Sequence, residues 1–278
     1  MAFTGVSVRD ALDGAVTAIG ASGSESPRLD AELLLAHALG VDRAALIIDP
    51  RREVTGDAVR AFQGLVRRRS VEREPVAYLL GTKGFRHIDL LVDHRVLVPR
   101  PETELLVEVG LELELGARVL DVGTGSGAVA LALKHERPDL HVTATDVSAD
   151  ALAVARQNGV RLGLDVAFLK ADLLGGVGGA FGAILSNPPY IAERDRAELP
   201  PDVVRHEPPG ALFAGEDGLD VIRRLAREAA GSAATLVAIE VGAGQAGEVA
   251  ALLAGAGFAA SEIRRDLAGI DRVVIGRR

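Results

Sequence analysis

The chain contains no cysteine and no tryptophan, and it has only two tyrosines and seven phenylalanines in 278 residues. Without cysteine it can form neither disulfides nor thiolate metal sites. The six histidines are scattered along the chain, and no pair has the spacing of metal ligands. We therefore expect a protein without a bound metal.

Positive charge is also in the minority, since 31 Lys and Arg stand against 39 Asp and Glu, a formal net charge of -8. Lys and Arg supply most of the affinity for phosphate backbones, so this balance argues against direct nucleic-acid binding. No apolar run approaches the ~20 residues that span a bilayer. The start, "MAFTGVSVRDAL", lacks the basic stretch and apolar run of a secretion signal. These features predict a cytoplasmic protein without a membrane partner.

Residues 1–82 have apolar residues at helical spacing and predict a small helical domain. Ser7 is a plausible N-cap for a first helix, and Gly40 a natural stop for a second. A third amphipathic segment ends near Arg67, Arg68 and Arg69, where the helix dipole favours cations. We interpret this run as a solvated helix end, with a docking patch for an acidic partner as the alternative.

From residue 83 onward, the sequence pattern is no longer that of a helical domain. Residues 83–98 predict a connecting β-hairpin, formed by "FRHIDLLVD" and "HRVLVP". In residues 99–278, nearly continuous apolar strands alternate with helices, which is typical of a parallel sheet covered on both faces. The last two strands are joined by a loop too short for a crossover, so they are expected to pair antiparallel. With 48% hydrophobic residues, the chain has ample core for these parts.

A glycine-rich turn joins the first of these strands to its helix in "LDVGTGSGAVAL". Gly123, Gly125 and Gly127 let the backbone turn sharply and approach a ligand, and the helix that follows points free N–H groups at it. The spacing is G-x-G-x-G rather than the G-x-G-x-x-G of dinucleotide sites. Alone, this turn fits a dinucleotide, a nucleoside or mere packing.

Acidic residues at neighbouring strand ends narrow the range of ligands that this turn could bind. Asp146 ends the next strand, where a carboxylate can accept hydrogen bonds from both hydroxyls of a ribose. Asp172 ends the strand after it and can meet an adenine amino group, while Leu173 can cover the ring. Asp121 lies under the glycine loop and either orients its amides or faces the sulfonium of a methyl donor. A lone Asp after a strand is more often a cap or turn residue, but these features occur on successive strand ends.

A stiff corner follows the fourth strand, in "AILSNPPYI". Pro188 and Pro189 have no N–H and a fixed φ, and each pushes the preceding residue toward extended geometry. The result is a rigid bend that exposes carbonyl oxygens. Asn187 adds a side-chain acceptor, and Tyr190 adds a flat face and a hydroxyl. A plain turn is the competing interpretation.

Converging acceptors beside a methyl donor suit a planar NH2 group. An amide nitrogen is a poor nucleophile because its lone pair is delocalised. Hydrogen bonds to both N–H groups hold it in line with the methyl carbon and favour the pyramidal nitrogen of the transition state. The residues therefore predict methylation of a planar amine or amide. They do not separate adenine from glutamine.

The order of these features resembles class I S-adenosylmethionine-dependent methyltransferases, with a nicotinamide dehydrogenase as runner-up. More specific stretches resemble the peptide chain release factor glutamine methyltransferase family, also called PrmC or HemK. The resemblance runs through the whole chain, including the helical N-terminal domain. The stretches are "EPVAYLLGTKGF", "VLVPRPETELLVE", "LDVGTGSG", "SNPPYI", "HEPPGALFAGEDGLDVI", "IEVGAGQ" and "RRDLAGIDRVV".

This resemblance implies a Rossmann-like class I methyltransferase sheet with an antiparallel last strand. It implies methyl transfer to the glutamine of the Gly-Gly-Gln loop of class 1 release factors, with S-adenosylhomocysteine as product. It also implies that the N-terminal helices help to dock the release factor. Separately, we expect a monomer. The expected glutamine site is Asn187, Pro188, Pro189 and Tyr190. The expected cofactor site is Asp121, Gly123, Thr124, Gly125, Ser126, Gly127, Asp146, Val147, Asp172, Leu173 and Asn187.

Two residues depart from the family pattern, and the roles of two others stay open. Leu173 stands where some members have an aromatic residue, and His206 stands where an aromatic is expected. We interpret His206 as a partly buried loop residue rather than a base. In "PRPETE", Arg100 and Glu104 either belong to a capped helix start or close over the cofactor or glutamine pocket.

Three alternatives remain within this chemistry. A relative that methylates a ribosomal-protein glutamine is the nearest. An adenine methyltransferase predicts a basic groove and a target-recognition domain, and the sequence shows neither. A catalytically dead binding protein predicts a lost Asn187 or a broken glycine loop, and both are intact.

Overall fold

The structure, a computed structural model, describes residues 5–278 apart from the side chains of Ala260 and Ser261. The chain divides into a helical unit, Met1–Gly81 with Pro200–His206, and a sheet unit, Thr82–Leu199 with Glu207–Arg278. The predicted boundaries at 82 and 98 stay a prediction. Residues 1–4, part of the stretch in which no secretion signal was expected, lie outside the described residues.

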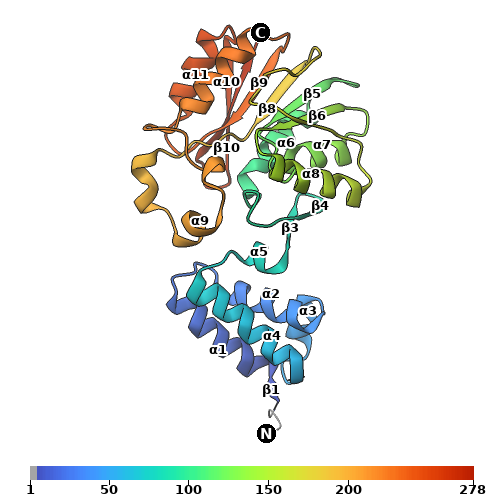
Figure 1. The fold of residues 1–278 in the computed structure, drawn as a ribbon, viewed down its shortest axis with the longest axis vertical. Helices are drawn as coiled ribbons and strands as arrows, with labels where there is room; N and C mark the ends of the chain where they lie inside the picture. Colours follow the sequence, from blue (N-terminus) through green and yellow to red (C-terminus); the bar gives the residue numbers. More distant parts are fainter. Residues whose placement is uncertain (1–4) are drawn as a thin grey trace. The chain divides into compact units, whose positions relative to one another are not determined.

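The helical unit packs short helices around one apolar core that includes Ile19, Leu34 and Leu35 (Figure 1). The side chain of Ser7 accepts a hydrogen bond from the backbone N–H of Asp10, and Gly40 ends the second helix at φ 62°, as predicted. The elements are β1 Val6–Ser7, α1 Val8–Ala21, α2 Pro27–Leu39, α3 Arg43–Ile48, β2 Glu53–Val54, α4 Gly56–Arg67, a π-helical turn Arg68–Glu72, α5 Val76–Leu80 and α9 Pro201–His206.

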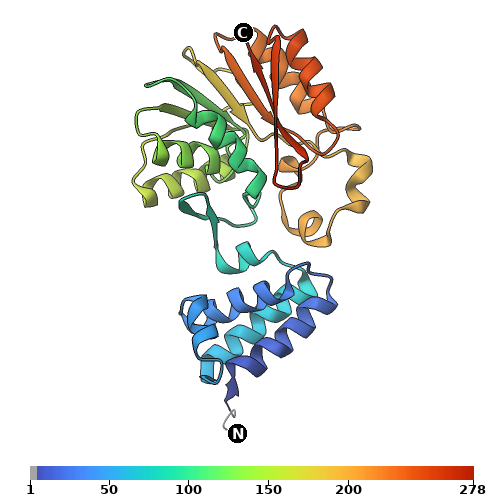
Figure 2. The ribbon, with the colours of Figure 1, turned by 180° about the vertical axis from the view of Figure 1, so that it is seen from behind.

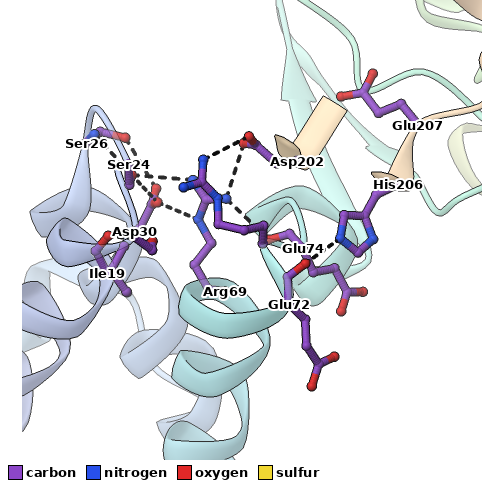
Figure 3. Close-up of polar contacts among 12 residues, drawn as sticks. Ile19, Ser24, Ser26, Asp30, Arg69, Glu72, Glu74, Asp202, His206 and Glu207 are labelled. Carbon is purple, nitrogen blue, oxygen red and sulfur yellow. Dashed lines mark hydrogen bonds and ion pairs between the residues drawn. The ribbon is translucent and has the colours of Figure 1, made fainter. Parts of the chain in front are cut away.

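The arginine run at the end of α4 is only partly solvated, which corrects the sequence interpretation. Arg67 and Arg68 are exposed, but Arg69 is 7% exposed. Its guanidinium donates to Asp30 at 2.8 Å and to Asp202 of α9 at 3.3 Å, as Figure 3 shows. The π-helical turn that begins at Arg68 places Arg69 in the interior of the unit. Arg69 is thus a structural cation that joins α2 and α9.

Replacement of Arg69 is expected to weaken the helical unit strongly. Arg69→Met should lower the free energy of unfolding by about 3–5 kcal/mol, because Asp30 is itself buried and would lose its counter-ion. Arg67→Ala is the matched control. Its ion pair to Glu72 is 3.7 Å long and its side chain is 74% exposed, so the change should be below about 1 kcal/mol. Urea unfolding of both variants measures these losses of unfolding free energy. Equal losses in the two variants would contradict the structural role of Arg69.

The sheet unit contains a seven-stranded sheet in the order β10-β11-β9-β8-β5-β6-β7. Strands β9, β8, β5, β6 and β7 run parallel, and β11 pairs antiparallel with both β9 and β10. This confirms the predicted fold. The strands are β5 Arg118–Val122, β6 His141–Asp146, β7 Ala167–Lys170, β8 Ala183–Ser186, β9 Leu236–Glu240, β10 Ala260–Arg265 and β11 Asp271–Arg277.

Helices cover both faces of the sheet, because its inner strands are apolar on both sides. Figures 1 and 2 show α6, α7 and α8 on one face and α10 and α11 on the other. Their bounds are α6 Glu104–Leu111, α7 Ala128–Glu136, α8 Ala149–Leu162, α10 Asp220–Ala230 and α11 Ala246–Gly255, with short 3-10 turns at Pro101–Thr103, Glu193–Glu198 and Pro209–Ala211. No helix in the described range is long and apolar enough to cross a bilayer.

The connecting hairpin lies earlier than its predicted register. It pairs β3 Thr82–Phe85 with β4 Ile88–Leu91, so the turn falls at Arg86, which has φ 48°. The backbone N–H of Arg86 donates to Glu104 at 3.1 Å. The expected second strand does not form, because Asp93 closes a turn by accepting from the backbone N–H of Arg95 at 3.0 Å.

The sheet order creates a switch point at β5. The chain moves from β5 to β6 on one side and later returns to β8 on the other. Ligands of open α/β sheets bind at the carboxyl ends of strands beside such a point. The segments after β5, β6, β7 and β8 are those in which the sequence predicted a site.

Candidate active site

A cavity of about 570 Å³ lies in the sheet unit at the carboxyl ends of these strands. That volume is within the range of small-molecule sites. Most of the predicted site residues line it: Asp121, Gly123, Thr124, Gly125, Ser126, Asp146, Val147, Asp172, Leu173, Asn187, Pro188 and Pro189. Four other predicted residues, Gly127, Tyr190, Arg100 and Glu104, are within the described range but not in this lining.

The glycine loop follows β5 and needs its glycines. Gly123, Gly125 and Gly127 have φ values of 76°, 56° and 86°, in the left-handed region that disfavours other residues. A side chain at Gly127 would also lie 2.8 Å from Leu131. The backbone N–H groups of Gly123 and Thr124 both donate to the carbonyl of Thr145 at 2.9 Å. The loop is therefore clamped to β6 against the cavity.

Asp146 is held in one orientation at the end of β6. Its two carboxylate oxygens accept hydrogen bonds from the backbone N–H groups of Gly125 at 2.9 Å and Ser148 at 2.8 Å. Burial raises the pKa of this carboxyl, and these hydrogen bonds oppose the rise. Each oxygen keeps a second lone pair. Asp146 can therefore accept further hydrogen bonds from hydroxyls in the cavity.

Asp121 supports the glycine loop from below. It is 1% exposed, and its carboxylate accepts from the hydroxyl of Thr124 at 2.6 Å. Burial raises its pKa to about 7, and the Thr124 hydrogen bond opposes this shift. Near neutral pH this carboxyl is divided between its two protonation states. A cation in the cavity would favour the ionised one.

The turn after β7 presents Asp172 and Leu173. Asp172 is exposed and pairs with Arg224 of α10 at 2.7 Å. Leu173 is buried and has φ 53°, unusual for a branched side chain. This conformation places Leu173 on the cavity wall, together with Arg224. The sequence analysis missed Arg224, whose position on an amphipathic helix gives no signal of a site.

The proline corner follows β8 and reaches the same cavity. The side-chain Nδ2 of Asn187 donates to the hydroxyl of Thr103 at 3.0 Å. The backbone carbonyl of Tyr190 accepts from Gln245 at 2.9 Å, which fixes the far end of the bend. Burial raises the pKa of the Tyr190 hydroxyl, which lies 3.4 Å from the carboxylate of Glu240.

The sequence analysis also missed Thr103 and Glu240. Thr103 lines the cavity and is 4% exposed, while Glu240 is 1% exposed at the end of β9. Burial raises the pKa of Glu240 to about 7. A signal was present, because Glu240 is an acid at a strand end, the same pattern that pointed to Asp146.

The other singled-out residues have partners of their own. Arg100 pairs with Glu207 at 2.6 Å, and Glu207 is 4% exposed. Glu104 accepts from the backbone of Arg86, as described above. His206 is partly buried, as expected, but it ends helix α9 rather than lying in a loop. Its Nε2 lies 2.8 Å from the carbonyl of Glu72 in the helical unit (Figure 3).

Two family models match the chain. One, described as PrmC N-terminal domain, matches residues 10–81, and another, described as Methyltransferase small domain, matches residues 101–206. A Deinococcus radiodurans protein named release factor glutamine methyltransferase is 45% identical over 278 residues, 98% of each chain. A Rhodospirillum rubrum protein of the same name is 41% identical over 273 residues, 96% of this chain and 84% of its own length.

Solved structures resemble the chain in fold. A methyltransferase from Pyrococcus furiosus has a TM-score of 0.52 at 21% identity, covering 68% of this chain and 88% of that chain. The catalytic domain of hMettl16, in complex with MAT2A 3′UTR hairpin 6, has a TM-score of 0.56 at 16% identity. The match covers 82% of this chain and 84% of that chain. Identities this low show the fold alone, and the fold agrees with the predicted methyltransferase sheet.

Proposed function

The chain belongs to the family of release factor glutamine methyltransferases, and we propose that it methylates the glutamine of the Gly-Gly-Gln motif in class 1 peptide chain release factors. The methyl group goes from S-adenosylmethionine to the side-chain amide nitrogen. This modification modulates translation termination.

One observation carries this proposal: the glycine loop and the proline corner line the same cavity. Strands β5 and β8 are direct parallel neighbours, with Val122 opposite Ser186. The segments that follow them, from Gly123 and from Asn187, therefore leave the sheet side by side. A donor on the first segment and an amide on the second would be held within reach of each other.

The residues present fit S-adenosylmethionine. Gly123–Gly127, Asp146, Val147, Asp172 and Leu173 are proposed to hold it, and when bound it supplies an electrophilic methyl group. Asp146 offers free lone pairs to the ribose hydroxyls, and Leu173 an apolar surface to the base. Asp121, buried under the loop, complements the positive charge of the donor.

The proline corner is proposed to orient the acceptor. With Nδ2 of Asn187 directed to Thr103, its Oδ1 is available to accept from one N–H of the substrate amide. The carbonyls of the corner accept from the other N–H, and Pro188 and Pro189 bring no N–H that would compete. Both contacts strengthen as positive charge develops on nitrogen, so they favour the transition state. The departing proton passes to water.

We place the release factor on the helical unit as well as at the cavity, because the relatives of the same name share sequence through both parts. The acidic chain suits a protein partner better than a nucleic acid. We further propose that the enzyme acts in the cytoplasm as a monomer, where translation supplies its substrate.

Mass spectrometry of a purified release factor, incubated with enzyme and methyl-labelled donor, tests the proposal. One labelled methyl group on the glutamine of the Gly-Gly-Gln peptide supports it. An untouched peptide, together with label in ribosomal protein or in DNA, overturns it. Omission of the donor is the control for prior methylation.

A further inference from the structure

A polar pair, Thr103 and Glu240, lies behind the proline corner, and the methyl transfer described above uses only the hydrogen bond from Asn187 to Thr103. Thr103 precedes α6 and Glu240 ends β9, and both side chains are almost fully buried. Thr103 accepts from Asn187, and its hydroxyl also lowers the pKa of Glu240, so it interacts with that carboxyl. Glu240 Oε2 has no hydrogen-bond partner among the described residues. A carboxylate left this incomplete is costly, which argues for a purpose.

The order of donors and acceptors in this group determines the direction of the Asn187 amide. An ionised carboxylate can only accept hydrogen bonds. Beside an ionised Glu240, the hydroxyl of Thr103 would turn its hydrogen toward that carboxylate and offer its oxygen to Asn187. Only Nδ2 of Asn187 can satisfy that oxygen, so Oδ1 is left for the substrate.

We propose that Thr103 and Glu240 are positioning residues that fix the direction of the Asn187 amide, so that an acceptor rather than a donor meets the substrate NH2 group. This inference rests on the proposed function. Neither residue touches the reacting atoms, and both act through Asn187.

Protonation of Glu240 removes the constraint. A protonated carboxyl can donate to Thr103, whose hydrogen then turns to Oδ1 of Asn187, and Nδ2 would face and repel the substrate NH2. The groups that face this carboxyl are the hydroxyls of Thr103 and Tyr190, the carboxylate of Glu102 and the guanidinium of Arg272. Burial is the dominant influence and places the pKa near 7, within reach of ordinary buffers.

Selective isotope labelling gives a direct readout, because Asn158 and Asn187 are the only asparagines in the sequence. With ¹⁵N-asparagine, the side-chain NH2 signals of Asn187 should shift with a midpoint near pH 7. Those of Asn158, which donates to the carbonyls of Leu91 and Ser126, serve as the internal control. Thr103→Val and Glu240→Gln should each abolish the shift. If the shift persists in either variant, or is absent from the wild type, the proposal is wrong.

Turnover on the release factor gives the second readout. Thr103→Val should lower kcat about tenfold and change KM less than about twofold, whereas Thr103→Ser keeps the hydroxyl and should restore most of kcat. Glu240→Gln should lower kcat and lose the decline in rate below pH 7. Unchanged kcat in Thr103→Val overturns the inference. If the wild type does not methylate the release factor, the proposed function fails. The side-chain NH2 signals of Asn187 then still test whether Thr103 and Glu240 fix the direction of its amide.

Stability distinguishes positioning from packing. The pKa of folded Glu240 lies above its unfolded value, so the folded state holds the proton more tightly and loses stability as pH rises toward and through 7. Glu240→Gln has no such loss. Relative to wild type, its Tm should be higher at about pH 8 than at about pH 5. A gain in Tm together with a loss of kcat supports positioning, and a uniform loss of Tm with unchanged kcat contradicts it.

Discussion

Asn187→Ala is expected to lower kcat on the release factor by about a thousandfold or more, while the Kd of the methyl donor changes less than about threefold. The substitution removes Oδ1, the acceptor that holds one N–H of the substrate amide. That contact strengthens only as the nitrogen becomes positive, so its loss falls on the transition state rather than on binding. The backbone at this corner is held by its prolines and is expected to keep its course.

The measurement combines single-turnover methylation, followed by mass spectrometry, with calorimetry of donor binding. Asn158→Ala is the matched control, because it removes an asparagine that holds the glycine loop rather than the substrate. Its Nδ2 donates to the carbonyl of Ser126, and its Oδ1 accepts from the backbone of Leu91. That variant should weaken donor binding more than kcat. A normal rate in Asn187→Ala would remove Asn187 from the mechanism.

The sequence predicts those features whose local geometry is determined by a few neighbouring residues. Gly123 and Gly125 lie between a buried strand and a helix, where the sharp turn needs the left-handed conformation that both adopt. Asp146 stands at a strand end, and in a parallel sheet all such ends lie on one edge. Asn187 precedes two prolines whose φ is fixed by their rings. In each case the chemistry of a few adjacent residues determines the local geometry.

The remaining features depend on partners far along the chain, which no local pattern specifies. Arg69 looks like a solvated cation in its helix, but Asp30 and Asp202 meet it only after folding. The hairpin register depends on Glu104, which receives the Arg86 amide, and on the turn closed by Asp93. Thr103 looks like part of a helix start, and its bond to Asn187 spans 84 positions. Pairings of this kind are set by the topology of the sheet.

Gly218→Ala is expected to lower kcat about a hundredfold and to destabilise the sheet unit, although Gly218 does not line the cavity. Gly218 has φ 81°, and a Cβ there would lie 2.3 Å from the carbonyl oxygen of Tyr190 and 2.9 Å from the backbone nitrogen of Ala192. Backbone atoms cannot turn away as a flexible side chain can. The segment that carries the proline corner would have to move by about 1 Å, a displacement that costs about two orders of magnitude in rate.

Gly257→Ala separates this clash from the strain of the backbone itself. Gly257 has φ 88°, nearly the same conformation, and a Cβ there would meet nothing within 4 Å. It should lose about 1–2 kcal/mol of unfolding free energy and keep its kcat. Gly218→Ala should lose more stability than Gly257→Ala, and its kcat should fall. The Kd of the donor should change little, because the glycine loop is clamped separately by the carbonyl of Thr145. Urea unfolding and single-turnover rates of the pair give the answer. If both variants behave alike, the position of the corner does not limit methyl transfer.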